Sequence, residues 1–262
     1  MNVRTVGLAA TVAATNFFRP SLARSIIGSI LQWRWLFTPR PLHTVSMGQL
    51  RETPLEIKMY LCPQAHGDTP PDDLLALCLL VNLQQPRTLF EFGTFRGQST
   101  INMIMNAAPG AHIHTLDAPP QKRASLDEWD SQVHDDCIGE LFQGSPYAAQ
   151  ITQILEDSRT LDTRDFRGSM DLIYIDAGHD YPFVRNDSEK AFEMLATDGM
   201  IVWHDYSPVK PGVRRYLQEL ANRRLLYWIA NTQIAFYFNT ETPPISDPEI
   251  LQRHTQLLQT LH

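Results

Sequence analysis

Acidic and imidazole side chains follow two short apolar runs in the second half of the chain. One run ends at Ile175 and is followed by Asp176 and His179, and the other ends at Trp203, two residues before Asp205. Carboxylates hold cations, and an imidazole moves protons near neutral pH. If both runs are strands of one parallel sheet, these side chains lie at its carboxyl edge, where open α/β proteins bind ligands.

A glycine-containing turn follows an earlier apolar run, which we expect to be a strand over 88–92. Gly93 lets the backbone approach a ligand without a Cβ, and Gly97 allows a close passage at the turn. Ser99 either caps the next helix or donates to a bound carboxylate. The spacing departs from the GxGxxG of dinucleotide sites, and Glu91, two residues before the first glycine, would repel a pyrophosphate. That acid suits a cationic amino-acid group.

Short apolar runs alternate with helical periods from residue 72 onward, which predicts an α/β fold whose mostly parallel sheet has helices on both faces. Only Asn231 and Thr232 separate the last two runs, too little for a crossover helix, so an antiparallel hairpin ends the sheet. We expect seven strands, over 88–92, 112–116, 151–155, 172–175, 200–203, 225–230 and 233–238, and helices over 72–83, 98–107, 185–195, 212–223 and 248–261.

Together these elements resemble a class I S-adenosylmethionine-dependent methyltransferase over roughly residues 70–240. The glycine turn and Asp117, which ends the next strand, carry part of the resemblance. The rest comes from the Asp-Ala-Gly-His-Asp-Tyr segment at 176–181 and from the Trp-His-Asp segment at 203–205. These segments are similar to the small-molecule O-methyltransferase branch related to macrolide-sugar and cephalosporin-type enzymes. The resemblance implies a Rossmann-like, seven-stranded methyltransferase sheet.

The resemblance also implies a cofactor site along the carboxyl edge. In that family the glycine turn holds the methionine moiety, an acid ending the second strand binds both ribose hydroxyls, and the end of the third strand reads adenine. A carboxylate with two oxygens is a natural acceptor for two neighbouring hydroxyls. The implied S-adenosylmethionine contacts are Glu91, Gly93, Gly97, Ser99, Asp117, Asp157, Ser158 and Asp176.

The implied chemistry is methyl transfer to a hydroxyl oxygen, for which a base or a metal must assist. By resemblance, Asp176 and Asp205 hold a divalent cation, Mg²⁺, and His179 accepts the proton, with Asp176 and His179 as the catalytic pair. The relatives carry an acid or amide beside the second metal-binding Asp, whereas this chain has His204 there. His204 could ligate a transition metal, but imidazole is a poor ligand for Mg²⁺.

Composition sets the organisation of the chain. Its 262 residues carry a net charge of −7, which argues against a nucleic-acid partner. Residues 1–51 contain six arginines and no acid, so we expect a basic arm over 1–60, a methyltransferase domain over 61–246 and a C-terminal helix over 247–262. An amphipathic helix over 22–37 would touch a membrane surface or cover the active site, or pack on its own domain or on a second copy of the chain.

Three cysteines without CxxC spacing indicate a reducing, cytoplasmic location.

The acceptor predicted by this reasoning is a hydroxylated small molecule, a sugar or a secondary metabolite. Residues 118–146 and the arm would cover it. Two other classes stay open at this stage. A binding or assembly protein would keep the fold without transfer activity, and an NAD-dependent oxidoreductase would have to do without GxGxxG and with an antiparallel sheet end.

Overall fold

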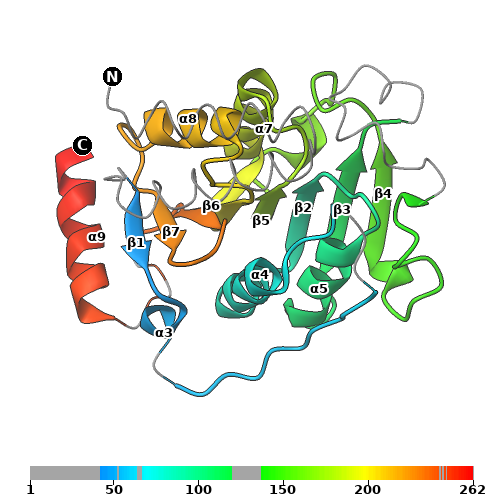
Figure 1. The fold of residues 1–262 in the computed structure, drawn as a ribbon, viewed down its shortest axis with the longest axis horizontal. Helices are drawn as coiled ribbons and strands as arrows, with labels where there is room; N and C mark the ends of the chain where they lie inside the picture. The colour runs from blue at the N-terminus through cyan, green and yellow to red at the C-terminus, as the bar shows by residue number, and fades with distance from the viewer. Residues whose placement is uncertain are drawn as a thin grey trace, which may run out of the picture.

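One eight-stranded sheet forms the centre of the protein (Figure 1). The computed structural model describes residues 42–261 apart from 52, 64–66, 120–136, 242, 244 and 246. Across the sheet the strand order is β1-β7-β8-β6-β5-β2-β3-β4. The strands are β1 (His43–Val45), β2 (Thr88–Phe92), β3 (His112–Asp117), β4 (Ile151–Leu155), β5 (Met170–Ile175), β6 (Leu195–Trp203), β7 (Tyr227–Ile229) and β8 (Ala235–Phe238).

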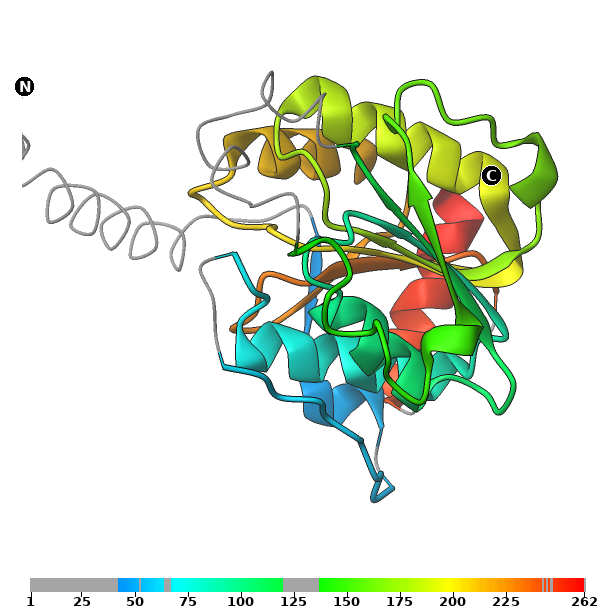
Figure 2. The ribbon, with the colours of Figure 1, turned by 90° about the vertical axis from the view of Figure 1, so that its right-hand side faces the viewer.

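Helices cover the sheet in two layers. In Figure 2 the sheet is seen nearly edge-on, with α4 and α5 on one side and α7 and α8 on the other. The helices are α3 (Met47–Leu50), α4 (Pro71–Gln84), α5 (Gln98–Asn106), α7 (Tyr181–Met194), α8 (Pro211–Leu220) and α9 (Pro248–Leu261), with 3-10 turns at Ala148–Gln150 and Arg164–Phe166. Within the described part of the chain, no helix combines the length and apolar character needed to cross a membrane.

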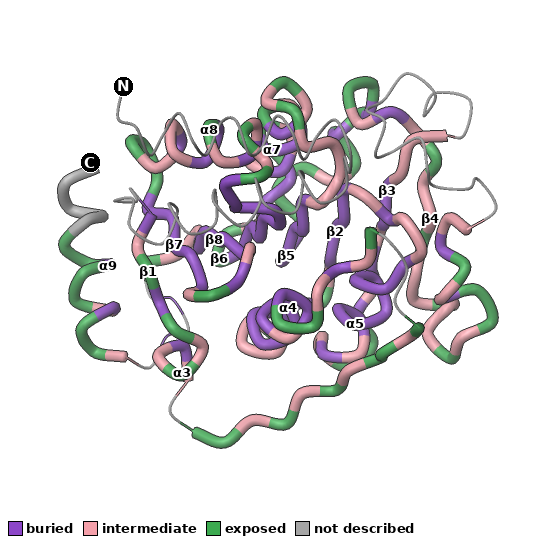
Figure 3. The backbone as a smooth tube through the Cα atoms, viewed as in Figure 1, coloured by how far each residue is buried: buried purple, intermediate pink, exposed green. Residues whose placement is uncertain are grey.

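The alternation of side chains along the central strands builds one apolar core on each face. In β5, Leu172 and Tyr174 pack with α4 and α5, whereas Ile173 and Ile175 pack with α7 and α8. All four side chains are buried, as expected for a strand with helices on both faces. The strands at the centre of Figure 3 are accordingly buried along most of their length.

The predicted α/β fold with a mostly parallel sheet is confirmed, and so is its antiparallel hairpin. Strand β8 runs antiparallel to both β6 and β7, while β2, β3, β4, β5 and β6 form the parallel part. The helix predicted over 248–261 is present as α9.

The predicted number of seven strands is wrong, because β1 adds an eighth. It pairs in parallel with β7, with His43 opposite Tyr227, although it lies inside the segment 1–60 that we predicted to be a separate arm. Three residues are too few to show a strand period, so only the pairing partner reveals them. The arm helix predicted over 22–37 lies outside the described residues, as do residues 120–136 of the predicted acceptor cover.

Candidate active site

The carboxyl ends of three neighbouring strands bring the predicted chemical residues together. In the sheet register Phe92 lies opposite Ile175, and Ile175 lies opposite Trp203. The residues that follow these strands therefore meet at one edge, with Gly93 after β2, Asp176 after β5 and the His204–Asp205 pair after β6. The expectation that the two acids share an edge is correct.

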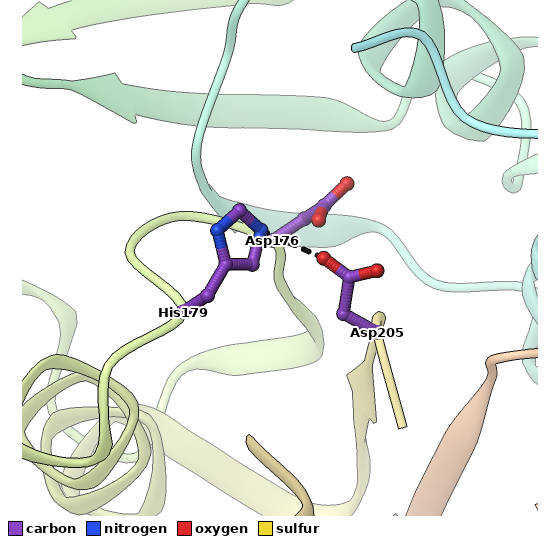
Figure 4. A group of neighbouring side chains, drawn as sticks. All are labelled: Asp176, His179 and Asp205. Carbon is purple, nitrogen blue, oxygen red and sulfur yellow. Dashed lines mark ion pairs between the residues drawn. The ribbon is translucent and has the colours of Figure 1, made fainter. Parts of the chain in front are cut away.

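His179 and Asp205 form a direct pair across this edge. The His179 Nε2 atom lies 2.7 Å from the Asp205 Oδ2 atom, and both side chains remain partly exposed at 25% and 12% (Figure 4). The loop that carries His179 is held by α8, because a Cβ on Gly212 would collide with the His179 carbonyl oxygen and lie 2.5 Å from the Tyr181 backbone nitrogen. Only glycine at this point lets the helix start approach the loop so closely.

His204 lies deeper and connects two carboxylates. Its Nδ1 atom is 3.0 Å from Asp176 Oδ1, and its Nε2 atom is 3.1 Å from Asp73 Oδ2, in the first turn of α4. The other Asp176 oxygen accepts a hydrogen bond from the Tyr174 hydroxyl at 3.1 Å. Asp73 also accepts the backbone N–H of Gln233 at 2.7 Å. The His204 side chain, only 8% exposed, is therefore fixed from both sides.

The carboxylates raise the pKa of both imidazoles. Burial lowers the pKa of His204, but the charges of Asp176 and Asp205 outweigh this effect and hold it well above its ordinary value. Burial likewise lowers the pKa of His179, and its hydrogen bond to Asp205 more than compensates, so that pKa is raised as well. Burial raises the pKa of Asp205, but the charge of the His204 ring and the hydrogen bond from His179 outweigh this effect and hold that pKa well below its ordinary value. The backbone of Asp205 also has φ of 60°, a strained conformation of the kind that clusters at functional sites.

The donor atoms at this edge differ from those expected for the predicted Mg²⁺ site. Among the described residues, Asp176, His179 and Asp205 each offer one donor atom, and these atoms lie within 4.8 Å of one another. His204 is not in this group, because both of its ring nitrogens face carboxylates. The Lys210 ammonium lies 3.6 Å from Asp205 Oδ2. Mg²⁺ takes oxygen ligands, so a set that includes an imidazole and borders an ammonium does not fit it.

Glu91 is enclosed in the protein rather than aimed at the sheet edge. Its carboxylate is 0% exposed and accepts hydrogen bonds from the hydroxyls of Ser99, Thr100 and Thr115, each at 2.5 Å. Burial raises its pKa to about 7, and the three hydroxyl donors only partly offset this. Both Glu91 and Ser99, which we predicted to contact the cofactor, therefore use their polar atoms to join β2, β3 and α5.

Both glycines of the turn have packing roles. Gly93 has φ of 98°, and a Cβ there would collide with the backbone carbonyl of Asp176, so this glycine lets the end of β2 lie directly against the end of β5. Gly97 has φ of 86°, and a Cβ there would lie 2.5 Å from the Phe142 ring. Packing against these protein neighbours therefore determines the conformation of the turn. The backbone groups that the turn places at the sheet edge follow from that conformation.

Asp117 lies where a ribose-binding acid is predicted. It ends β3 and is partly exposed, and its Oδ2 atom accepts the backbone N–H of Phe95 at 2.8 Å. Phe95 belongs to the glycine turn and has φ of 45°. Asp117 and the turn are therefore held against each other, and a ligand at one would reach the other.

The predicted adenine segment is ordered by its own ion pair. Asp157 binds the Arg159 side chain through both carboxylate oxygens, with Nη2 to Oδ2 at 2.7 Å. Ser158 hydrogen-bonds Asp187, a fully buried acid in α7 whose pKa burial raises to about 6. These bonds fix the loop after β4 beside α7.

Sequence reasoning missed several residues that build this edge. Asp73 and Gln233 come from distant elements, and Lys210 stands just before α8. A signal existed for Lys210, since it lies five residues after Asp205 and before the Pro-Gly start of a helix. No local pattern pointed to Asp73, which looked like an ordinary acid in the first turn of a helix.

The strand order and the helices on both faces of the sheet define a Rossmann-like methyltransferase fold. In agreement, residues 90–206 match the family model described as a methyltransferase domain. This segment is therefore a methyltransferase domain. This assignment sets the oxidoreductase alternative aside. No curated protein shows significant sequence similarity to the chain.

Solved structures share the fold at low sequence identity. A protein from Corynebacterium glutamicum aligns with 10% identity and a TM-score of 0.52, covering 66% of this chain and 82% of its own. The O-methyltransferase from Bacillus cereus, in complex with S-adenosylhomocysteine, has 20% identity, coverage of 67% and 82%, and a TM-score of 0.48. The O-methyltransferase of tomaymycin synthesis from Streptomyces achromogenes, in complex with S-adenosylmethionine, has 20% identity, coverage of 64% and 78%, and a TM-score of 0.45.

Proposed function

We propose that the protein transfers a methyl group from S-adenosylmethionine to a hydroxyl oxygen of a small molecule, such as a sugar or another secondary metabolite. The observation that carries the proposal is the pair formed by His179 and Asp205 at 2.7 Å on the carboxyl edge. An alcohol is a weak nucleophile at neutral pH, so a hydroxyl acceptor needs a positioned base. An imidazole oriented by a carboxylate provides one.

Asp205 determines which nitrogen of His179 acts. Its carboxylate accepts a hydrogen bond from Nε2–H, so the lone pair of the neutral ring is on Nδ1. In Figure 4 this second nitrogen is on the side of the ring away from Asp205. His179 would accept the acceptor proton at Nδ1, and Asp205 would stabilise the imidazolium that results.

The cofactor, when bound, supplies an electrophilic methyl group. The acceptor oxygen forms a bond to that carbon while the carbon–sulfur bond breaks and its electron pair goes to sulfur, which leaves a methyl ether and S-adenosylhomocysteine. The protein contributes alignment and a base, and it forms no covalent bond to the substrate.

Cofactor binding would involve Asp117 and the backbone of the Gly93 turn, with Asp157 and Ser158 beside the adenine. The position of Asp117 supports this proposal, since it is partly exposed and adjoins the turn through Phe95. Asp176 would face the cofactor methyl from the end of β5. No step of the proposed reaction passes through Mg²⁺.

The proposed setting is a reducing one, such as the cytoplasm. None of the cysteines that the structure describes forms a disulfide, which supports this location. The proposed partner is the small acceptor itself, and nucleic acid plays no part. Contact of the basic arm with a membrane surface or with a second copy of the chain remains a prediction.

A methyl-transfer assay tests the proposal. The full chain is incubated with methyl-labelled S-adenosylmethionine and a panel of sugars, phenols and alcohols, and both labelled ether and S-adenosylhomocysteine are measured. Calorimetry with S-adenosylmethionine on the unaltered protein and on Asp117→Ala tests the cofactor site separately. Binding without transfer to any hydroxyl would favour the non-catalytic alternative, and transfer only to nitrogen or carbon acceptors would contradict the O-methyltransferase proposal.

A further inference from the structure

The two acids at the carboxyl edge are already surrounded by donors from the protein. Asp176 accepts from His204 through one oxygen at 3.0 Å and from the Tyr174 hydroxyl through the other at 3.1 Å. Asp205 pairs through Oδ2 with His179 at 2.7 Å and with the Lys210 ammonium at 3.6 Å. Its Oδ1 atom lies 3.8 Å from the His204 ring. Each carboxylate oxygen that would bind a cation thus already faces a hydrogen-bond donor or a cationic nitrogen.

Protein cations also offset most of the negative charge at this edge without an ion. His204 lies between two carboxylates that can only accept, so its ring donates from both nitrogens and is positive. Lys210 adds a second positive charge. These two cations offset two of the three negative charges of Asp73, Asp176 and Asp205, so the cluster carries one net negative charge when His179 is neutral. A divalent cation would add two charges directly beside an ammonium.

We propose that His204 and Lys210 supply the positive charge that a divalent cation would otherwise bring, so that methyl transfer is independent of metal and the Lys210 ammonium contacts the acceptor oxygen. This inference rests on the proposed O-methyl transfer. It differs from the expectation raised by the sequence, in which Asp176 and Asp205 bind Mg²⁺ and His204 could ligate a transition metal.

Lys210 is placed to act on a bound acceptor. It is the residue before α8, and its side chain is 27% exposed while the paired Asp205 is 12% exposed. A cation at this position stabilises the negative charge that develops on the acceptor oxygen as His179 removes its proton. His204 is more enclosed, so it balances Asp176 and Asp73 and does not touch the acceptor.

The first experiment needs no acceptor. Calorimetry with Mg²⁺ or Mn²⁺ alone, added to the full chain at up to about 1 mM, is expected to give no binding heat, because even weak calcium sites bind in that range. Metal analysis of the purified protein is expected to find less than stoichiometric divalent metal. Saturable binding of either ion that is lost in Asp205→Asn would overturn the proposal, whatever the assay of methyl transfer shows.

The second experiment uses an acceptor identified by the methyl-transfer panel. Turnover is expected to be unchanged by a chelator, and Lys210→Met is expected to lose about 100-fold in kcat, the loss typical of removing one donor to a developing oxyanion. Lys210→Arg, which keeps the charge, should recover part of that loss, and Lys58→Met, at an exposed lysine on the segment that binds the end of α5, should behave as the unaltered protein. Melting temperatures check that each variant folds. Chelator-sensitive turnover, or a folded Lys210→Met with full activity, would overturn the inference while leaving O-methyl transfer intact.

Discussion

The two ends of the carboxyl edge are built differently. At β5 and β6, Asp176 and His179 are partly exposed, and His179 pairs with the buried Asp205. At β2, the polar and glycine residues contact the protein interior. Gly93 packs against the backbone that follows β5, and the Glu91 carboxylate accepts hydrogen bonds from three buried hydroxyls. The comparison shows that residues of one predicted site can have separate tasks, with one group exposed for chemistry and the other holding the strands that position it.

Replacement of the proposed base has the largest expected effect. His179→Ala should lower kcat about 1,000-fold with little change in stability, since a positioned base contributes between two and four orders of magnitude. The measurement is methyl transfer under saturating substrate, with the melting temperature as a check on folding. The matched control is Asp180→Ala, at an exposed neighbour that makes no side-chain capping bond. Equal losses in the two variants would show that the loop matters and the imidazole does not.

Substitution of Gly93 tests the packing role of the turn after β2. Gly93→Ala should reduce the free energy of unfolding by about 3 kcal/mol, because it adds a positive-φ penalty and a collision with the Asp176 carbonyl. Gly144→Ala is the control, since Gly144 has φ of 75° but nothing within 4 Å of the added Cβ. It should cost about 1 kcal/mol. Urea unfolding of both variants measures the difference, and equal costs would contradict the proposed packing role of Gly93.

The raised pKa of the buried Glu91 carboxyl predicts that the free energy of unfolding depends on pH. The pKa of Glu91 is raised from 4.5 to about 7 in the folded protein, so the folded state binds more protons than the unfolded state between these values. Stability from this group is therefore full below about pH 4.5 and falls as the pH rises through 7, by on the order of 3 kcal/mol in total.

A variant isolates this contribution. Glu91→Gln cannot ionise, so its unfolding free energy should decline less between pH 5 and 8 than that of the unaltered protein, whatever its absolute stability. Glu241→Gln, at an exposed acid, should keep the original slope. Parallel pH curves for Glu91→Gln and the unaltered protein would show that Glu91 is already ionised at pH 5.

The smallest expected effect is at the proposed ribose acid. Asp117→Asn keeps one oxygen for the Phe95 N–H and loses one of two acceptors, so the dissociation constant for S-adenosylmethionine should rise about tenfold. Calorimetry measures it, with Asp162→Asn, at an exposed ion pair, as the control. An unchanged dissociation constant would remove Asp117 from the proposed cofactor site.

Sequence patterns were informative wherever the determining contacts are local or follow from strand register. The ends of β2, β5 and β6 could be located from short apolar runs, and parallel pairing then brings Asp176 and Asp205 to one edge. His179 follows because it is only three residues from Asp176. The site geometry at β5 and β6 was therefore largely predictable.

Contacts between distant segments were not predictable. Asp73 meets His204 across 131 residues, and nothing near either residue signals the partner. Glu91 was expected to meet a ligand because an acid before a glycine turn fits that role, but Ser99, Thr100 and Thr115 enclose it. The residues next to an acidic residue in the sequence do not show whether solvent, a ligand or buried hydroxyls surround its carboxylate in the folded protein.

Strand β1 has a consequence for handling the protein. Its pairing with β7 covers backbone groups of a strand that would otherwise form the border of the sheet. A recombinant version starting after residue 46 would leave those amides and carbonyls open to strands of other molecules, and uncovered borders of this kind promote aggregation. Shortened versions should therefore begin before His43 if they are to stay monodisperse.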